Sequence, residues 1–350
     1  MKKRLTAMIG AGLSALTLTG CAMFQPVDVD RAATEAVDPN AITLRFGNVY
    51  EASHPVNSCG LEPMKEELAA KGFNVLIYPA AQIGSEAEMV EQVATGALDF
   101  VNSGPSFLGA WYPEAAVLDG AYLAADAAEL QAATTGDIMS GVFDRMAAET
   151  DLRVVSNFYY GARQITANKA VRTPADLNGL KIRTPDAPLY LTTLDIMGAT
   201  ATPMALSEVY LGLQQNTIDA QENPIPTIAS AKFYEVQDYI SITEHIVQGV
   251  YLVGNQRLLD SMDPAKRDIL TQAIDDARVR VEECTVKQEK EILADWKKTG
   301  EITVVDDVDI QAFRDLVAKE LPNRVTWGDT YLAVKKSLED ARAEAGEENS

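Results

Sequence analysis

The order of hydrophobic and polar positions predicts a chain built from alternating strands and helices. Apolar and polar side chains alternate along residues 42–47, as they do in a strand with one buried face. Further strands are expected at 73–78, 98–101 and 152–158. Between them, apolar residues recur every three to four positions, which predicts helices at 62–71, 85–96 and 126–149. This alternation is typical of an α/β sheet with parallel members.

A second block repeats this pattern further along the chain. Strands are expected at 163–168, 180–183, 199–204 and 218–223, with a turn into a short helix at 173–177. Helices are expected at 189–197 and after Ser207, which we interpret as an N-cap. Two strand-like runs between residues 238 and 255 would then return the chain to the first block.

One long helical pattern dominates the last third of the chain. From Pro264 to Lys298 neither a glycine nor a second proline interrupts it, and a helix of that length spans roughly 50 Å. Because one small domain needs no helix of this length, we expect it to brace both blocks. Helices near 310–321 and 329–345 complete the chain.

The amino-terminal segment is typical of an export signal. Basic residues at positions 2–4 precede an uncharged apolar run over 5–18, which is too short for a membrane span. The run ends in Leu18-Thr19-Gly20-Cys21, which resembles the bacterial lipobox, where the cysteine thiol takes a diacylglycerol. We therefore expect a lipoprotein signal peptide at 1–20, a tether at 21–40, and an exported, periplasmic protein that is anchored through its cysteine. The alternative is an ordinary secretory signal with a chance cysteine.

Two cysteines remain once Cys21 is assigned to the lipid. Export would place Cys59 and Cys284 in an oxidising compartment, where paired cysteines tend to be bridged. The sequence does not show that the two meet, so one disulfide and two separately buried thiols stay open as alternatives.

Composition and charge exclude several classes of function. With 30 basic against 51 acidic residues, the chain carries a formal charge of −21, which disfavours nucleic-acid binding and adsorption to an anionic membrane surface. With only two histidines, His54 and His245, a histidine-rich metal site lacks ligands, and we expect neither a metal nor another cofactor. Residues 21–350 contain no P-loop, H-E-x-x-H, C-x-x-C or G-x-S-x-G motif. A lipid-anchored hydrolase with a carboxylate pair stays an alternative, because 51 carboxylates make such pairs easy to form.

Several motifs between residues 42 and 335 occur in a recognisable order. They are Tyr78-Pro79-Ala80-Ala81-Gln82-Ile83-Gly84, Tyr112-Pro113-Glu114-Ala115, Gly161-Ala162-Arg163-Gln164, the segment 175–185 (ADLNGLKIRTP), the segment 203–210 (PMALSEVY) and Asp219-Ala220-Gln221-Glu222-Asn223-Pro224. In this respect the chain resembles the substrate-binding proteins of tripartite ATP-independent periplasmic (TRAP) transporters, of the dicarboxylate-binding-protein type.

The resemblance implies a fold and a function. It implies a periplasmic binding protein of two α/β domains that enclose the ligand in a cleft, with boundaries expected at 41–160 plus 249–288 and at 161–248 plus 289–345. It further implies capture of an organic acid through its carboxylate and delivery to a sodium-driven TRAP membrane permease. We expect a monomer that is not an enzyme and meets the membrane only through its lipid anchor. A sensory binding protein without transport is a further alternative.

The resemblance also assigns roles to three residues. Arg183 of the K-I-R-x-P motif would bind the ligand carboxylate, and Arg163 and Asn223 would contact the ligand. The residues themselves agree with this, because arginine presents a planar fork that matches a carboxylate and Arg183 lies at the end of a predicted strand. The alternatives are a surface salt bridge for Arg183, an inter-domain ion pair for Arg163, and a turn residue before Pro224 for Asn223.

Weaker candidates follow other predicted strands. Gln82, Ser103, Tyr160 and Leu206 could also contact the ligand, and the aromatic residues Tyr159, Trp111 and Tyr190 could either stack on it or belong to the core. Two departures argue against sialic acid as the ligand. Leu206 stands where sialate-binding relatives carry phenylalanine, and the segment 101–104 lacks their acidic residue. A smaller hydroxy, keto or sugar acid fits as well.

Overall fold

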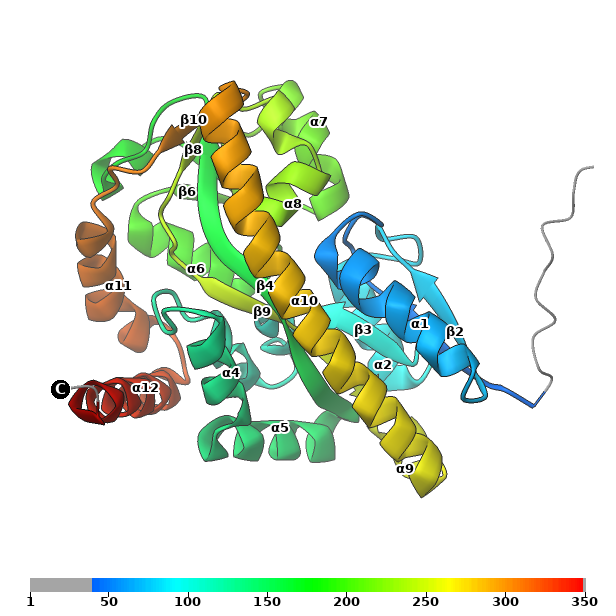
Figure 1. Ribbon diagram of the computed structural model, residues 1–350. Helices are drawn as coiled ribbons and strands as arrows, with labels where there is room; N and C mark the ends of the chain where they lie inside the picture. The colour runs from blue at the N-terminus through cyan, green and yellow to red at the C-terminus, as the bar shows by residue number, and fades with distance from the viewer. Residues whose placement is uncertain (1–39, 349–350) are drawn as a thin grey trace, which may run out of the picture. The chain divides into compact units, whose positions relative to one another are not determined.

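A mixed β-sheet forms the centre of the fold, and the computed structural model describes residues 40–348 of it and its surroundings (Figure 1). The main sheet has the strand order β2-β1-β3-β9-β4-β7-β5-β6. The strands are β1 (Ile42–Gly47), β2 (Phe73–Tyr78), β3 (Phe100–Ser103), β4 (Leu152–Ala167), β5 (Lys181–Thr184), β6 (Thr200–Pro203), β7 (Ala220–Pro224), β8 (Tyr239–Ser241), β9 (Val247–Asn255) and β10 (Thr303–Val305). Strands β1 to β3 are parallel to one another, and so are β5 to β7, which confirms the predicted α/β class.

Strand β4 joins the two parallel groups. Its first part pairs antiparallel with β9, and its last five residues pair antiparallel with β7. The sequence predicted two strands at 152–158 and 163–168, and that interpretation was wrong. Residues 159–162 continue the strand because β9 supplies hydrogen-bond partners across a register shift between Tyr159 and Gly161.

Helices cover the sheet and connect its strands. The α-helices are α1 (Glu62–Ala69), α2 (Glu86–Thr95), α3 (Pro105–Leu108), α4 (Ala127–Thr135), α5 (Asp137–Thr150), α6 (Pro188–Met197), α7 (Val209–Gln214), α8 (Ile225–Ser230), α9 (Gln256–Ser261), α10 (Pro264–Thr299), α11 (Ile310–Arg324) and α12 (Gly328–Glu348). Short π and 3₁₀ turns are η1 (Val56–Leu61), η2 (Pro113–Asp119), η3 (Pro174–Leu177), η4 (Leu206–Glu208) and η5 (Phe233–Glu235).

Two predicted helices differ from the structure. The single helix expected at 126–149 is divided into α4 and α5, because Gly136 adopts an extended conformation with φ −68° and ψ 154°. Ser207 is not an N-cap. It lies inside the 3₁₀ turn η4, and helix α7 begins only at Val209.

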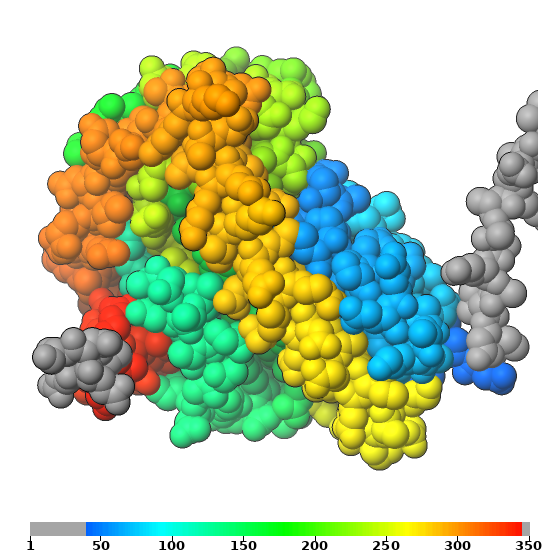
Figure 2. Space-filling model, in the orientation of Figure 1, coloured from blue at the N-terminus to red at the C-terminus, as the bar shows by residue number. Residues whose placement is uncertain are grey.

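The predicted long helix is confirmed as α10. It begins after Asp263, whose side chain accepts hydrogen bonds from two backbone N–H groups of the first turn, and it ends at Gly300 with φ +73°. It packs against β4, α1 and α8, and Figure 2 shows it as a continuous band on this face of the molecule. Leu270 and Val281 are buried in one apolar cluster and Trp296 in another, each contributing roughly 1.5–3 kcal/mol or more through burial.

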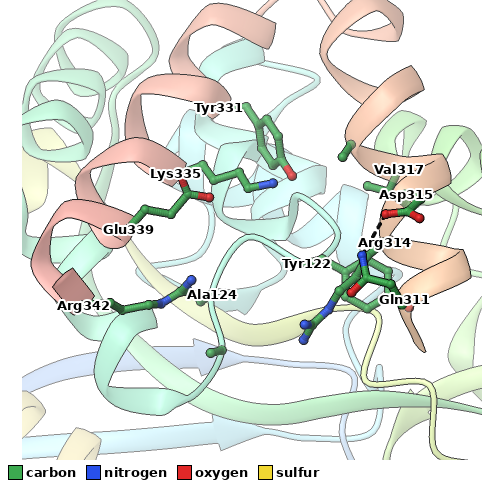
Figure 3. A pocket seen from close by; sticks show the side chains of 12 residues that line it. Tyr122, Ala124, Gln311, Arg314, Asp315, Val317, Tyr331, Lys335, Glu339 and Arg342 are labelled. Atoms are coloured by element: carbon green, nitrogen blue, oxygen red, sulfur yellow. Dashed lines mark hydrogen bonds between the residues drawn. The ribbon is translucent and has the colours of Figure 1, made fainter. Parts of the chain in front are cut away.

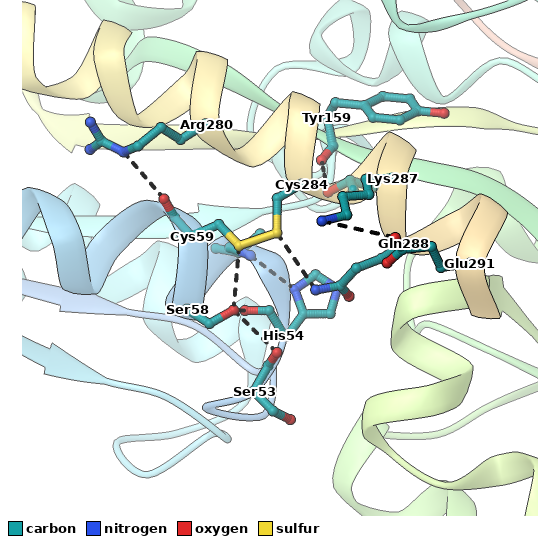
Figure 4. Close-up of a disulfide and its surroundings, with 12 residues drawn as sticks. Ser53, His54, Ser58, Cys59, Tyr159, Arg280, Cys284, Lys287, Gln288 and Glu291 are labelled. Atoms are coloured by element: carbon teal, nitrogen blue, oxygen red, sulfur yellow. Dashed lines mark hydrogen bonds and ion pairs between the residues drawn. A yellow bond between two sulfur atoms is a disulfide. The ribbon is translucent and has the colours of Figure 1, made fainter.

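A disulfide between Cys59 of η1 and Cys284 of α10 ties the long helix to the amino-terminal part of the fold (Figure 4). Of the two alternatives for these cysteines, the structure contains the bridge. The neighbouring Gly60 permits this close approach, because a Cβ there would lie 2.6 Å from Cγ2 of Val281. Arg280 adds a hydrogen bond from Nε to the Cys59 carbonyl at 3.3 Å.

The predicted signal peptide, the lipidation site Cys21 and the tether up to residue 39 lie outside the described residues. Within residues 40–348, no helix combines the length and the apolar character that crossing a membrane requires.

Candidate functional site

A cavity of about 490 Å³ opens where the parallel strands of both groups end. One wall follows β1, β2 and β3, and the other follows β5 and β6. Two smaller cavities of about 20 and 30 Å³ adjoin it, and Val49 and Leu206 line all three. In open α/β sheets the carboxyl ends of strands are the usual place for a ligand. These three cavities are called the cleft below.

Arg183 presents an unpartnered cation to the cleft. Its Nε and Nη2 donate to the carbonyl oxygen of Met204 at 2.9 and 2.7 Å, which fixes the guanidinium in the plane of this loop. Its side chain is 2% exposed, and Nη1 has no hydrogen-bond partner among the described residues. Burial lowers the pKa of Arg183 to about 10. A buried charged donor without a partner is costly, so this nitrogen is positioned for an anionic ligand atom.

Arg163 is the second buried arginine, but its charge is already balanced. It pairs with the Glu222 carboxylate through Nε and Nη2, and its Nη1 donates to Gln248 Oε1 at 2.7 Å. Glu222 also accepts a hydrogen bond from Thr184 Oγ1 at 2.6 Å and contacts His245 Nε2 at 3.1 Å. Burial alone would raise the pKa of Glu222, but Arg163 outweighs it and holds that pKa at about 2. The pair therefore adds no net charge to the cleft.

Asn223 and Tyr160 complete the inner wall. The Tyr160 hydroxyl donates to Asn223 Oδ1 at 3.2 Å, and Asn223 Nδ2 donates to Gln221 Oε1 at 2.6 Å. Both residues line the 20 Å³ cavity together with the two arginines and Leu206. The structure thus brings together five of the seven predicted contact residues.

Gln82 and Ser103 do not line the cleft. Gln82 is exposed in the turn that follows β2, and Ser103 is buried with its Oγ directed at Glu86 Oε1, 3.0 Å away. Ser103 therefore holds a neighbouring side chain instead of facing the cavity. Among the aromatic candidates, Tyr190 lines the cleft, whereas Trp111 is 40% exposed elsewhere.

Glu86 is a residue of the cleft that the sequence analysis missed. It is the first residue of α2, follows the capping residue Ser85, and lines the same two cavities as Arg183. Besides Ser103, the backbone N–H of Gly104 donates to its Oε1 at 2.6 Å. Desolvation raises the pKa of Glu86 to about 7 against the effect of these bonds. The available signal was its place at a helix start that directly follows a parallel strand.

A second buried carboxylate supports the wall beside Tyr190. Asp119 accepts hydrogen bonds from the Tyr190 hydroxyl at 2.7 Å, from Gln248 Nε2 at 2.8 Å and from Ser106. Burial raises the pKa of Asp119. The Tyr190 ring in turn lies 5.3 Å from the guanidinium carbon of Arg163, so these side chains hold one another in place.

Another cavity, of about 310 Å³, lies between α11, α12 and residues 122–125 (Figure 3). Its side chains carry both signs of charge: Arg314 lies over the Tyr122 ring at 5.5 Å, and Arg342 pairs with Glu129. Arg314 and Arg342 are solvent-exposed, and among the described residues none that lines this cavity has a buried polar atom without a partner. The cleft is therefore the better candidate for a ligand site. Within residues 40–348 no cluster of three or more metal-ligating side chains is present.

The model of one protein family, described as bacterial extracellular solute-binding protein, family 7, matches residues 46–325. The chain belongs to this family. Two other similar proteins have stated ligands. The sialic acid-binding periplasmic protein of Vibrio cholerae is 33% identical over 79% of this chain and 86% of its own length. The 2,3-diketo-L-gulonate-binding periplasmic protein of Escherichia coli is 31% identical over 80% and 86%.

Solved structures of family 7 proteins share the fold. A TRAP periplasmic solute-binding protein from Chromohalobacter salexigens with bound D-glucuronate has a TM-score of 0.78 and 28% identity, covering 85% of this chain and 99% of its own. One from Roseobacter denitrificans with bound L-galactonate has a TM-score of 0.79, 27% identity and the same coverage. The predicted family and fold class, and the role of a periplasmic binding protein that captures an organic acid for a TRAP permease, are confirmed at the level of the family.

Proposed function

We propose that this family 7 protein captures a sugar acid with one carboxylate and several hydroxyl groups. The single observation that carries the proposal is the buried Nη1 of Arg183, which has no partner among the described residues. A ligand carboxylate bound there would supply the missing acceptor and a counter-charge in a site from which water is largely excluded.

The charges of the cleft support one carboxylate and disfavour two. Arg163 is balanced by Glu222, so only Arg183 offers an uncompensated positive charge. The outer walls carry Glu86, Asp186 and Glu208, which would repel a second carboxylate. A dicarboxylate would therefore bind more weakly than a monocarboxylate of similar size.

The remaining polar groups suit hydroxyls. Glu86 uses Oε1 for Ser103 and Gly104, which leaves Oε2 without a partner among residues 40–348. A ligand hydroxyl could donate to this oxygen. Relatives in the family are described with bound D-glucuronate and L-galactonate, which combine one carboxylate with a row of hydroxyls.

A panel of ligands tests the proposal. Melting temperature and calorimetric affinity are measured with D-glucuronate, L-galactonate, N-acetylneuraminate, succinate and L-galactonamide, the neutral analogue of L-galactonate. We expect the strongest stabilisation from one of the two sugar acids and almost none from the amide. Succinate as the best ligand, or an amide that binds as well as its acid, would contradict the proposal. Recovery of the bound acid without chemical change distinguishes a binding protein from the hydrolase alternative.

We also propose that the walls of the cleft belong to two domains, 41–160 plus 249–288 and 161–248 plus 289–345, that close around the ligand. Support comes from the cleft lining, which draws on strand ends of both parallel groups, and from β4, β9 and α10, which connect these groups. Small-angle scattering should give a smaller radius of gyration with saturating ligand, and an unchanged radius would argue against closure.

The export and anchoring of the chain complete the proposal. Cys21 is inferred to carry a lipid because the motif Leu18-Thr19-Gly20 precedes it. The lipid would hold the protein at the membrane that contains the TRAP permease, to which the captured acid is delivered.

A further inference from the structure

The bulge in β4 decides which side chains reach the cleft. The register of β4 against β9 shifts between Tyr159 and Gly161, so Tyr160 is an extra residue without a counterpart on β9. In a regular strand, residues three positions apart point to opposite faces. The extra residue cancels this alternation, and Tyr160 and Arg163 both line the cleft beside Gln248.

A side chain of the long helix holds this bulge. Glu289 of α10 accepts a hydrogen bond at Oε1 from the backbone N–H of Ala162 at 2.8 Å. Its Oε2 accepts another from the Tyr159 hydroxyl at 3.2 Å. One turn earlier, Thr285 Oγ1 donates to the Tyr159 carbonyl oxygen at 3.4 Å. Residues four apart lie on one helix face, so one face of α10 contacts β4 on both sides of the bulge.

Gly161 makes room for this carboxyl group. Its φ of +119° is one that residues with a side chain rarely adopt, and a Cβ there would lie 2.7 Å from Glu289 Oε1 and 2.8 Å from the Pro224 Cβ. Burial raises the pKa of Glu289 to about 7. The carboxyl has therefore left water, and Ala162 and Tyr159 supply the hydrogen bonds that water would have made.

We propose that Glu289 is a positioning residue of the binding site. By accepting the Ala162 N–H it fixes the bulge that turns Tyr160 and Arg163 toward the same wall of the cleft. Glu289 does not itself line the cleft, so its effect on the ligand passes through β4.

Three variants test the brace without any ligand. Glu289→Ala removes the acceptor, Glu289→Gln keeps an oxygen that can accept the same bond, and Glu291→Ala removes an exposed acid of the same helix as a matched control. Hydrogen exchange should show a large loss of protection at the Ala162 amide in Glu289→Ala alone. A crystal structure of that variant should show Tyr160 or Arg163 displaced. Unchanged protection, or both side chains in their present positions, overturns the proposal.

Affinity for L-galactonate provides the second readout, and only this part rests on the proposed function. We expect Glu289→Ala to weaken binding roughly 5- to 150-fold, the range that follows from leaving one buried N–H unpaired. Glu289→Gln and Glu291→Ala should stay within about twofold of wild type. Unchanged affinity in Glu289→Ala overturns the positioning role. If wild type does not bind L-galactonate, the proposed function fails, and hydrogen exchange and the crystal structure still decide the role of Glu289.

A further variant guards against poor folding of Glu289→Ala. Gly161→Ala would place a Cβ where the carboxyl now lies and displace it from Ala162. Loss of protection at the Ala162 amide in this variant supports the proposal, and retained protection counts against it.

Discussion

Replacing Arg183 by methionine separates ligand binding from folding. Methionine fills a similar apolar volume but removes the buried charge and its Nη1 donor. Truncating one partner of a buried charge pair typically costs 2–5 kcal/mol, so Arg183→Met should weaken binding of the preferred acid by roughly 30-fold to several thousand-fold. Arg183→Lys should recover only part of this, because a point charge cannot bond the Met204 carbonyl and a ligand carboxylate with the same fork.

The ligand-free protein should respond differently. Burial lowers the pKa of Arg183 from 12.5 to about 10, which amounts to roughly 3 kcal/mol of destabilisation at neutral pH. A buried charge replaced by an apolar side chain of similar size is often neutral or stabilising. Arg183→Met should therefore keep or raise the melting temperature without ligand while it abolishes the increase caused by ligand.

Calorimetry on a double-mutant cycle decides whether Arg183 touches the carboxylate. Wild type and Arg183→Met are titrated with L-galactonate and L-galactonamide, or with whichever acid and amide pair the panel selects. If the arginine and the carboxylate form one interaction, the amide loses far less affinity on Arg183→Met than on wild type. Additive losses would refute the reasoning, and so would a ligand-free variant that melts well below wild type.

Three further predictions concern other parts of the chain. Because desolvation sets the pKa of Glu86 near 7 and a ligand anion on Arg183 would raise it further, affinity should fall as pH rises through 7, and Glu86→Gln should flatten this dependence in calorimetry between pH 5.5 and 8.5; an equal slope in the variant would contradict it. Reducing the disulfide between Cys59 and Cys284, which are 225 residues apart, should lower the free energy of unfolding by up to about 5 kcal/mol in urea titrations, and two free thiols in untreated protein would contradict the bridge. Cys21→Ser should move the protein out of the detergent phase and leave an unprocessed precursor, and identical partitioning of wild type and variant would refute the anchor.

Local patterns predicted the helices better than they predicted the path of the strands. Helix α10 was expected almost to the residue because its signal, an uninterrupted helical period between Asp263 and Gly300, is contained in the segment itself. Strand β4 was divided in two because residues 159–162 take their partners from β9, nearly ninety positions away. No local pattern reports that pairing.

The candidate site shows the same limit. The K-I-R-x-P motif pointed to Arg183, but only the structure shows that the Met204 carbonyl occupies two of its nitrogens and leaves one. The balance between Arg163 and Glu222 arises across 59 positions of sequence, so the motifs suggested two available cations where the structure has one. Glu86 looked like an ordinary helix start until Gly104, 18 residues later, was found bonded to it.

The placement of the disulfide sets the order of events when the chain leaves the cytoplasm. Export delivers the amino terminus first, so Cys59 reaches the periplasm 225 residues ahead of its partner in α10. During that interval its thiol is open to mixed disulfides with small thiols or with other exported chains. The bond that ties the long helix to the amino-terminal part of the fold can therefore form only after most of the chain has been translocated. Periplasmic oxidation then acts as a late checkpoint, and a chain truncated before residue 284 would keep a reactive thiol at Cys59.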